Sequence, residues 1–155
     1  LYLQGIKEFS NSPELIGNYA LFLSDIKKDY DGALKYYRKA LVIDPDNATN
    51  NADYAGLLIR RGDFRSAKWR IDQAFRHADG ENDTSLLAEV WLYCFACFYS
   101  DYPQAERELK KLMNAGVRSE GWDFSACIAD AKKNRHPKLG KVIKYAEAIS
   151  GRKYE

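Results

Sequence analysis

Small and large apolar residues return along the chain in a fixed order. Two segments share it: Ala33, Tyr37 and Ala40 in the first, and Ala67, Ile71 and Ala74 in the second. The corresponding alanines lie 34 positions apart. Residues spaced by three, four and seven positions lie on one face of an α-helix, so each segment predicts a helix that packs closely through small side chains. Such a helix does not bury its apolar face alone, and we expect neighbouring copies to stack.

Turn and capping signals divide this pattern into hairpins. Ser12 and Pro13 are typical of a helix start, and Gly62 is typical of a helix end. An acidic residue followed by an aromatic residue occurs at 29–30 and again at 63–64. A weaker third copy at 101–105 lies 38 positions beyond the second, because the loop at 79–84 is longer. The signals predict helical hairpins over residues 13–45, 46–79 and 84–116.

The remaining segment, 117–155, has a different pattern. It predicts a short helix at about 124–133 and a last helix at about 137–150. The last helix carries one apolar stripe, formed by Leu139, Val142, Ile143, Ala146 and Ile149. On the opposite, solvated side we expect Lys138, Lys141 and Lys144. One apolar and one charged face are typical of helices that close a repeat array.

The period and the turn residues resemble those of the tetratricopeptide repeat. The first copy supplies the expected residues Ala20, Asp29, Tyr30, Ala33, Tyr37, Ala40 and Pro45. The second supplies Ala55, Gly62, Asp63, Phe64, Ala67 and Ala74, with Ile71 and Asp79 in place of an aromatic residue and proline. The resemblance is strong over 13–78, fair over 85–116 and absent beyond. It implies an all-α, right-handed α-solenoid of about three tetratricopeptide-like hairpins with a C-terminal helical cap.

Composition places few further limits on function. The chain has 155 residues, of which 46% are hydrophobic and 30% charged, and a net charge of +2. This balance does not by itself demand nucleic acid or an anionic membrane as partner. No apolar run is long enough to span a membrane and no secretory signal is visible, so we expect no membrane partner. Three cysteines are an odd number, which favours a reducing compartment such as the cytoplasm. The oligomeric state is left open.

The first residues have a separate interpretation. Residues 1–5 resemble the recognition sequence of the potyviral protease that removes purification tags, with Leu3 in place of the usual Phe. We interpret them as the remnant of a tag and residues 6–12 as an N-terminal lead-in. On this interpretation the chain is expected to be a fragment of a longer protein.

Catalytic and metal-binding patterns are weak. Cys94 and Cys97 have the spacing of a redox or zinc pair, but they lie within an apolar helical run, and we interpret them as packing residues. His77 and His136 are far apart and lack a neighbouring nucleophile pattern. There is no phosphate-binding loop and no nucleotide fingerprint. We therefore predict no enzyme activity, no cofactor and no metal.

The family resemblance implies a concave groove that is lined by the first helix of each hairpin and binds a partner peptide. The carried-over positions are Glu14, Asn18, Leu21 and Asp25 in the first repeat, then Thr49, Asp53, Gly56 and Arg60 in the second. Leu87, Trp91 and Cys94 are the approximate positions in the third. Trp91 is interpreted either as an exposed apolar anchor or as buried against the loop or the C-terminal helices. The amide of Asn18 both donates to and accepts from a peptide backbone.

One known function of the family is disfavoured. Cochaperones of this family hold a C-terminal carboxylate with Lys, Arg and Asn, but here these positions carry Gly17, Leu21, Asp53, Leu87 and Trp91. We therefore predict a non-enzymatic module for another protein or peptide partner. Alternatives remain: self-association, an immunity or inhibitor role with one dedicated partner, or RNA binding through basic faces. The candidate basic patch comprises Arg65, Lys68, Arg70, Lys138, Lys141 and Lys144.

Overall fold

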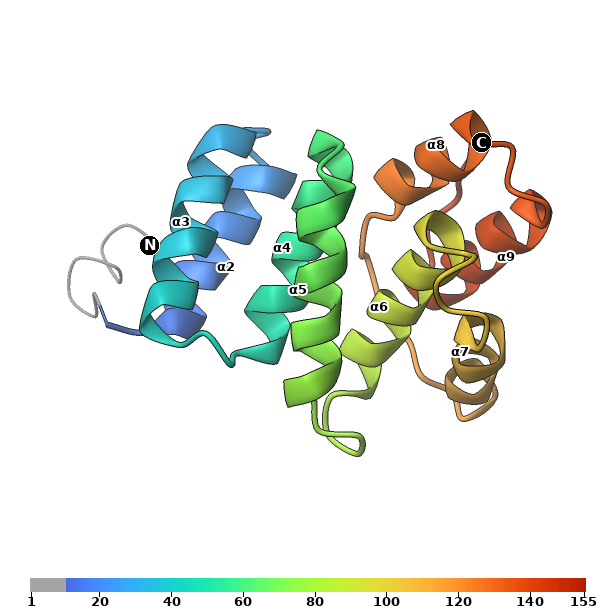
Figure 1. Cartoon of the computed structure of the whole chain (residues 1–155), viewed down its shortest axis with the longest axis horizontal. Helices are drawn as coiled ribbons and strands as arrows, with labels where there is room; N and C mark the ends of the chain where they lie inside the picture. The colour runs from blue at the N-terminus through green and yellow to red at the C-terminus, as the bar shows by residue number, and fades with distance from the viewer. Residues whose placement is uncertain (1–10) are drawn as a thin grey trace. The chain divides into compact units, whose positions relative to one another are not determined.

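A computed structural model describes residues 11–155 (Figure 1). This part of the chain contains eight α-helices and no strand, which confirms the predicted all-α class. The chain divides into two compact units, with the boundary between His77 and Ala78. The suggested tag remnant at 1–5 and most of the lead-in lie outside the described residues. No helix within the described residues is long and apolar enough to cross a membrane.

Residues 11–77 of the first unit form two helical hairpins. Helices α2 (Pro13–Asp25) and α3 (Tyr30–Ile43) form one, and α4 (Ala48–Arg61) and α5 (Phe64–His77) form the other. All four helices begin with side-chain caps: Ser12 accepts from Leu15 N, Asp29 from Gly32 N, Asn47 from Asn50 N and Asp63 from Ser66 N. Gly62 ends α4 in the left-handed region, with φ of 79°, which glycine adopts without a steric cost. The capping signals at Ser12 and Gly62 are thus confirmed.

The repeated small residues form the interior of the first unit. The fully buried alanines are Ala20, Ala33, Ala40, Ala52, Ala55, Ala67 and Ala74. Among the repeated aromatic residues, Tyr37 is buried and stacks on Tyr54, with ring centroids 5.5 Å apart. Tyr30 and Phe64 are only partly buried, so they contribute less to the interior than Tyr37. The small side chains allow the helices to approach closely, and the tyrosine pair fills the space that remains.

The second unit is organised around one helix. α6 (Thr84–Cys97) packs against α7 (Ala105–Asn114), α8 (Ser125–Lys133) and α9 (Leu139–Ser150). Nine of its residues are buried, including Val90, Leu92 and Phe95. The two C-terminal helices therefore cover the first helix of the expected third hairpin rather than only its end. Val142, Ala146 and Ile149 of the predicted apolar stripe are buried as expected.

The C-terminal tail folds back onto the second unit. Gly151 ends α9 in the left-handed region. The Tyr154 hydroxyl donates to the carbonyl of Trp122 at 3.0 Å and accepts from the backbone N–H of Phe124 at 3.1 Å. The backbone N–H of Tyr154 donates to Glu147 Oε1 at 3.1 Å. These bonds fix the loop that enters α8 against the end of α9.

Candidate functional site

Close packing of α2 against α4 positions the candidate groove. Gly17 is buried, and a Cβ atom at this position would lie 1.9 Å from Asn50 Oδ1. The side chain of Asn50 occupies the space that Gly17 leaves, and its Nδ2 donates to the carbonyl of Pro13 at 3.0 Å. Asn47, the cap of α4, donates to Glu14 Oε1 at 3.4 Å. The N-terminal ends of the two helices are therefore tied together.

The groove positions on these two helices are accessible in different degrees. Four of them are exposed: Glu14, Asn18, Asp25 and Thr49. Four are partly buried: Leu21, Asp53, Gly56 and Arg60. On each of the two helices the four positions are spaced by four, three and four residues, so they lie along one face of that helix. The structure thus leaves an extended, mostly polar surface on α2 and on α4.

Arg60 has a defined neighbour in the first unit. Its guanidinium carbon lies 5.5 Å from the centroid of the Tyr30 ring, a cation–π contact. This contact joins the last turn of α4 to the first turn of α3. The ring of Tyr30 therefore orients Arg60, a role that the sequence pattern did not indicate.

The third-repeat positions do not form an equivalent set. Cys94 is fully buried, so its inclusion among the groove positions was wrong; the cause is that α8 and α9 pack against α6. Leu87 and Trp91 are partly buried. These residues belong to the second unit, whereas α2 and α4 belong to the first. The candidate site is accordingly built on α2 and α4.

The predicted basic residues have different environments. Arg65 and Lys144 are exposed and Lys68 is partly buried. Arg70 lies over the Tyr54 ring, with its guanidinium carbon 5.1 Å from the ring centroid. Burial is the main cause that lowers the pKa of Arg70. The six residues therefore do not form a uniform solvated face.

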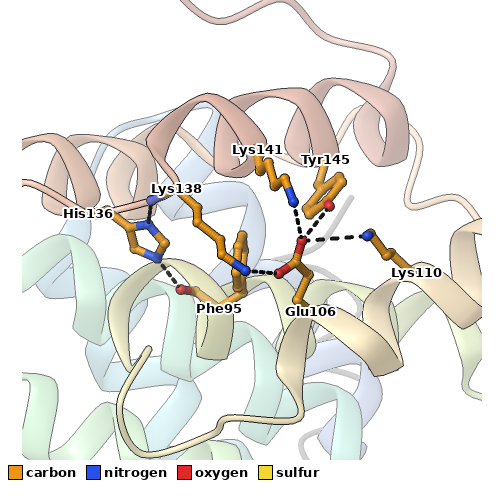
Figure 2. Close-up of polar contacts among 7 residues, drawn as sticks. All are labelled: Phe95, Glu106, Lys110, His136, Lys138, Lys141 and Tyr145. Carbon is orange, nitrogen blue, oxygen red and sulfur yellow. Dashed lines mark hydrogen bonds and ion pairs between the residues drawn. The ribbon is translucent and has the colours of Figure 1, made fainter.

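Lys138, the residue before α9, and Lys141 of α9 turn toward α7, contrary to the expected solvated side (Figure 2). Lys138 Nζ lies 2.7 Å from Glu106 Oε2, and Lys141 Nζ lies 3.2 Å from Glu106 Oε1. The Tyr145 hydroxyl donates to the same carboxylate at 2.8 Å. Hydrogen bonding from Lys138 is the main cause that lowers the pKa of Glu106 to about 2. Burial, followed by the Glu106 carboxylate, raises the pKa of Tyr145 to about 12. A local carboxylate thus compensates much of this positive charge.

The histidines are engaged in structural contacts. His136 Nε2 donates to the carbonyl of Phe95 at 2.7 Å, and the backbone N–H of Lys138 donates to His136 Nδ1 at 2.9 Å (Figure 2). His77 Nε2 lies 3.3 Å from Asp46 Oδ1. In the described part of the chain, no three His, Cys, Asp or Glu side chains are grouped to hold a metal ion.

The cysteines allow a direct chemical test. Cys94, Cys97 and Cys127 are all free thiols. A hydrogen bond with Cys127 and burial raise the pKa of the Cys97 thiol. Because the thiolate is the reactive form, we expect iodoacetamide to leave Cys97 unmodified in the folded protein at neutral pH and to alkylate it in guanidinium chloride. Peptide mass spectrometry measures both states. Equal alkylation of Cys97 in the two states would contradict a partly buried, protonated thiol.

Comparisons with known proteins support the helical-repeat architecture. A tetratricopeptide repeat family model matches residues 26–89. A TPR repeat-containing protein of Dictyostelium discoideum is 27% identical over 122 residues, which cover 76% of this chain and 45% of the relative. The chain thus spans about half the length of that curated relative. No solved structure matches the chain. The match over residues 26–89 and this relative support the assignment of the chain to the tetratricopeptide repeat family, whose repeats generally serve as modules for binding other proteins.

Proposed function

We propose that the first unit binds a segment of a partner protein along the exposed faces of α2 and α4, without catalysing a reaction. The observation that carries this proposal is the interlock of Gly17 with Asn50, which fixes the spacing of the two helices before a partner arrives. A preformed surface loses less conformational entropy on binding than a flexible one. We also propose a reducing compartment such as the cytoplasm, because the three thiols are free.

The chemistry of the surface suits an extended backbone. The side chains of Asn18 and Thr49 are exposed, and each provides both donors and acceptors. Asp53 and Arg60 add charges of opposite sign on α4. Leu21 and Gly56 provide small apolar area between these polar groups. Polar contacts to a peptide backbone with limited apolar burial are typical of recognition that depends on shape and hydrogen bonds.

A variant series tests the groove. The substitutions Asn18→Ala, Asp53→Ala and Arg60→Ala, combined in one chain, should lower the affinity for a groove partner by about tenfold or more, because several hydrogen bonds are lost together. The partner is first identified by capture from source-cell lysate with nuclease present, and its affinity for purified protein is then measured by calorimetry. The control carries Arg65→Ala and Lys144→Ala, which lie on α5 and α9.

Three outcomes contradict the proposal that the groove binds the partner. One is a partner that binds the triple variant with unchanged affinity. A second is retention that disappears with nuclease, which favours RNA binding. The third is capture of the chain by its own copies alone, together with a mass that rises with concentration. Circular dichroism of the triple variant confirms that the helices are intact.

A further inference from the structure

Two arginines contact the same tyrosine, Tyr54, at the surface of the first unit. Arg38 Nε, on α3, donates to the Tyr54 hydroxyl at 3.1 Å. Arg70, on α5, lies over the ring of the same tyrosine, and its Nη1 donates to Asn51 Oδ1 at 3.2 Å. Tyr54 itself is buried and stacked on Tyr37. The two guanidiniums are therefore held by rigid neighbours rather than by flexible ones.

Among the described residues, no carboxylate contacts this pair of cations. Within residues 11–155, the contacts of Arg38 and Arg70 are with an aromatic hydroxyl, an amide oxygen and aromatic rings. The positive charge of Arg38 also contributes, after burial, to lowering the pKa of Arg70. Most N–H donors of the two guanidiniums are thus left without a protein acceptor in this region. An anion placed between them would relieve the repulsion and accept several hydrogen bonds.

Exposed apolar side chains flank the arginine pair. Val42, one turn after Arg38 on α3, is 83% exposed. Trp69, next to Arg70 on α5, is 55% exposed, and the Arg70 guanidinium carbon lies 4.7 Å from its ring centroid. A shallow cavity of about 410 Å³ beside Trp69 is lined by Arg65, Ser66, Lys68 and Asp72. Single exposed apolar residues are common, but here two of them adjoin one focus of positive charge.

We propose that this surface, defined by Arg38, Val42, Trp69 and Arg70, binds an acidic segment of a partner protein. A carboxylate of Asp or Glu lies on the two guanidiniums, and a large apolar side chain of the same segment packs beside Trp69. The complementary charge and the planar donors of arginine both favour a carboxylate. Val42 favours protein over nucleic acid, because an aliphatic side chain, unlike that of Trp69, offers no stacking face for a base. This surface uses α3 and α5, whereas the proposed groove uses α2 and α4.

A random peptide library displayed on phage tests the proposal without a presumed partner. The purified chain is immobilised, and enriched peptides are synthesised and titrated by fluorescence anisotropy. We expect enriched peptides with Asp or Glu next to a large apolar residue. Their affinity should fall about tenfold or more in Arg38→Gln and in Val42→Glu, which remove a cation and add a repelling carboxylate. Both residues are exposed, so both variants should fold.

Matched controls separate this surface from the groove. Lys144→Gln, which removes an exposed cation from α9, and Asn18→Ala, which alters the groove, should leave the affinity of these peptides unchanged. Four results would overturn the proposal. The first is a selection that enriches no acidic peptide. The second is a peptide affinity that does not change in Arg38→Gln and Val42→Glu, and the third is peptide binding that is lost in Asn18→Ala. The fourth is displacement of bound peptide by polyuridylate at lower concentration than by the unlabelled peptide.

Discussion

Replacing Gly17 with alanine should lower the free energy of unfolding by about 2 kcal/mol, although alanine is the better helix former. The added Cβ atom would lie 1.9 Å from Asn50 Oδ1 and 2.7 Å from Asn50 Cγ. Asn50 is 3% exposed, so its side chain has little room to move away. Displacing it also breaks its bond to the carbonyl of Pro13.

Two opposing effects set the size of this change. Alanine in a helix interior gains about 1 kcal/mol over glycine. Overpacking and a lost buried hydrogen bond cost about 3 kcal/mol together. The steric term is expected to win because the clash is between atoms of two different helices, α2 and α4. Urea unfolding followed by circular dichroism gives the free energy. Amide hydrogen exchange localises the loss to the first unit.

Replacing a glycine with alanine where there is free space should raise the free energy of unfolding instead of lowering it. Gly140 lies in α9, and a Cβ atom there would meet nothing within 4 Å. Gly140→Ala should therefore stabilise the chain by about 0.5–1 kcal/mol. Equal shifts of the two variants in one direction would mean that the Gly17–Asn50 contact does not hold α2 against α4. The double variant Gly17→Ala with Asn50→Ala should lose less stability than the two single changes add up to, because the clash is gone.

Local signals account for what the sequence predicted. The period between Ala33 and Ala67, the capping residue Ser12 and the turn glycine Gly62 each act within a few residues of their own position. Such signals locate helices and identify the residues that neighbouring helices bury. They are sufficient to predict the helical class and the buried alanines without any knowledge of contacts between distant residues.

The features that the sequence did not predict depend on contacts between residues that are distant along the chain. Glu106 lies 32 positions from Lys138 and 39 from Tyr145, and nothing in its own helix marks it as their partner. Cys94 had the position of a groove residue, yet packing of α8 and α9 on α6 buries it. Arg38 and Arg70 belong to different helices, and both are brought to one place by their contacts with Tyr54. The candidate groove rests on the family resemblance together with exposure, and it stays a proposal.

Glu106 should carry the largest pH-dependent contribution to stability. Its pKa is lowered from 4.5 to about 2, first by the hydrogen bond from Lys138 and then, against burial, by those from Tyr145 and Lys141. A shift of this size corresponds to about 3 kcal/mol. The lysine side chains are 39% and 49% exposed, so solvent screening reduces the contribution to about 2 kcal/mol.

The sign of this contribution follows from linkage. The carboxyl is more acidic in the folded chain than in the unfolded chain, so the unfolded chain binds more protons at low pH. The stabilisation is therefore present in full above pH 4.5 and is lost as the pH falls toward 2. Glu106→Gln should lower the free energy of unfolding by about 2 kcal/mol at pH 7, and its difference from the native chain should shrink toward zero near pH 2.

A neighbouring glutamate provides the matched control for this experiment. Glu108 lies on the same helix and pairs with Arg107 and Lys111, whose side chains are 68% and 65% exposed. Exposed pairs of this kind contribute about 0–1 kcal/mol, so Glu108→Gln should change stability little at any pH. Urea unfolding at a series of pH values compares the two variants. Parallel pH profiles for Glu106→Gln and the native chain would show that α7 and α9 are held together by apolar packing alone. Converging profiles would show that one carboxylate, shared by three lysines and a tyrosine, joins the two helices.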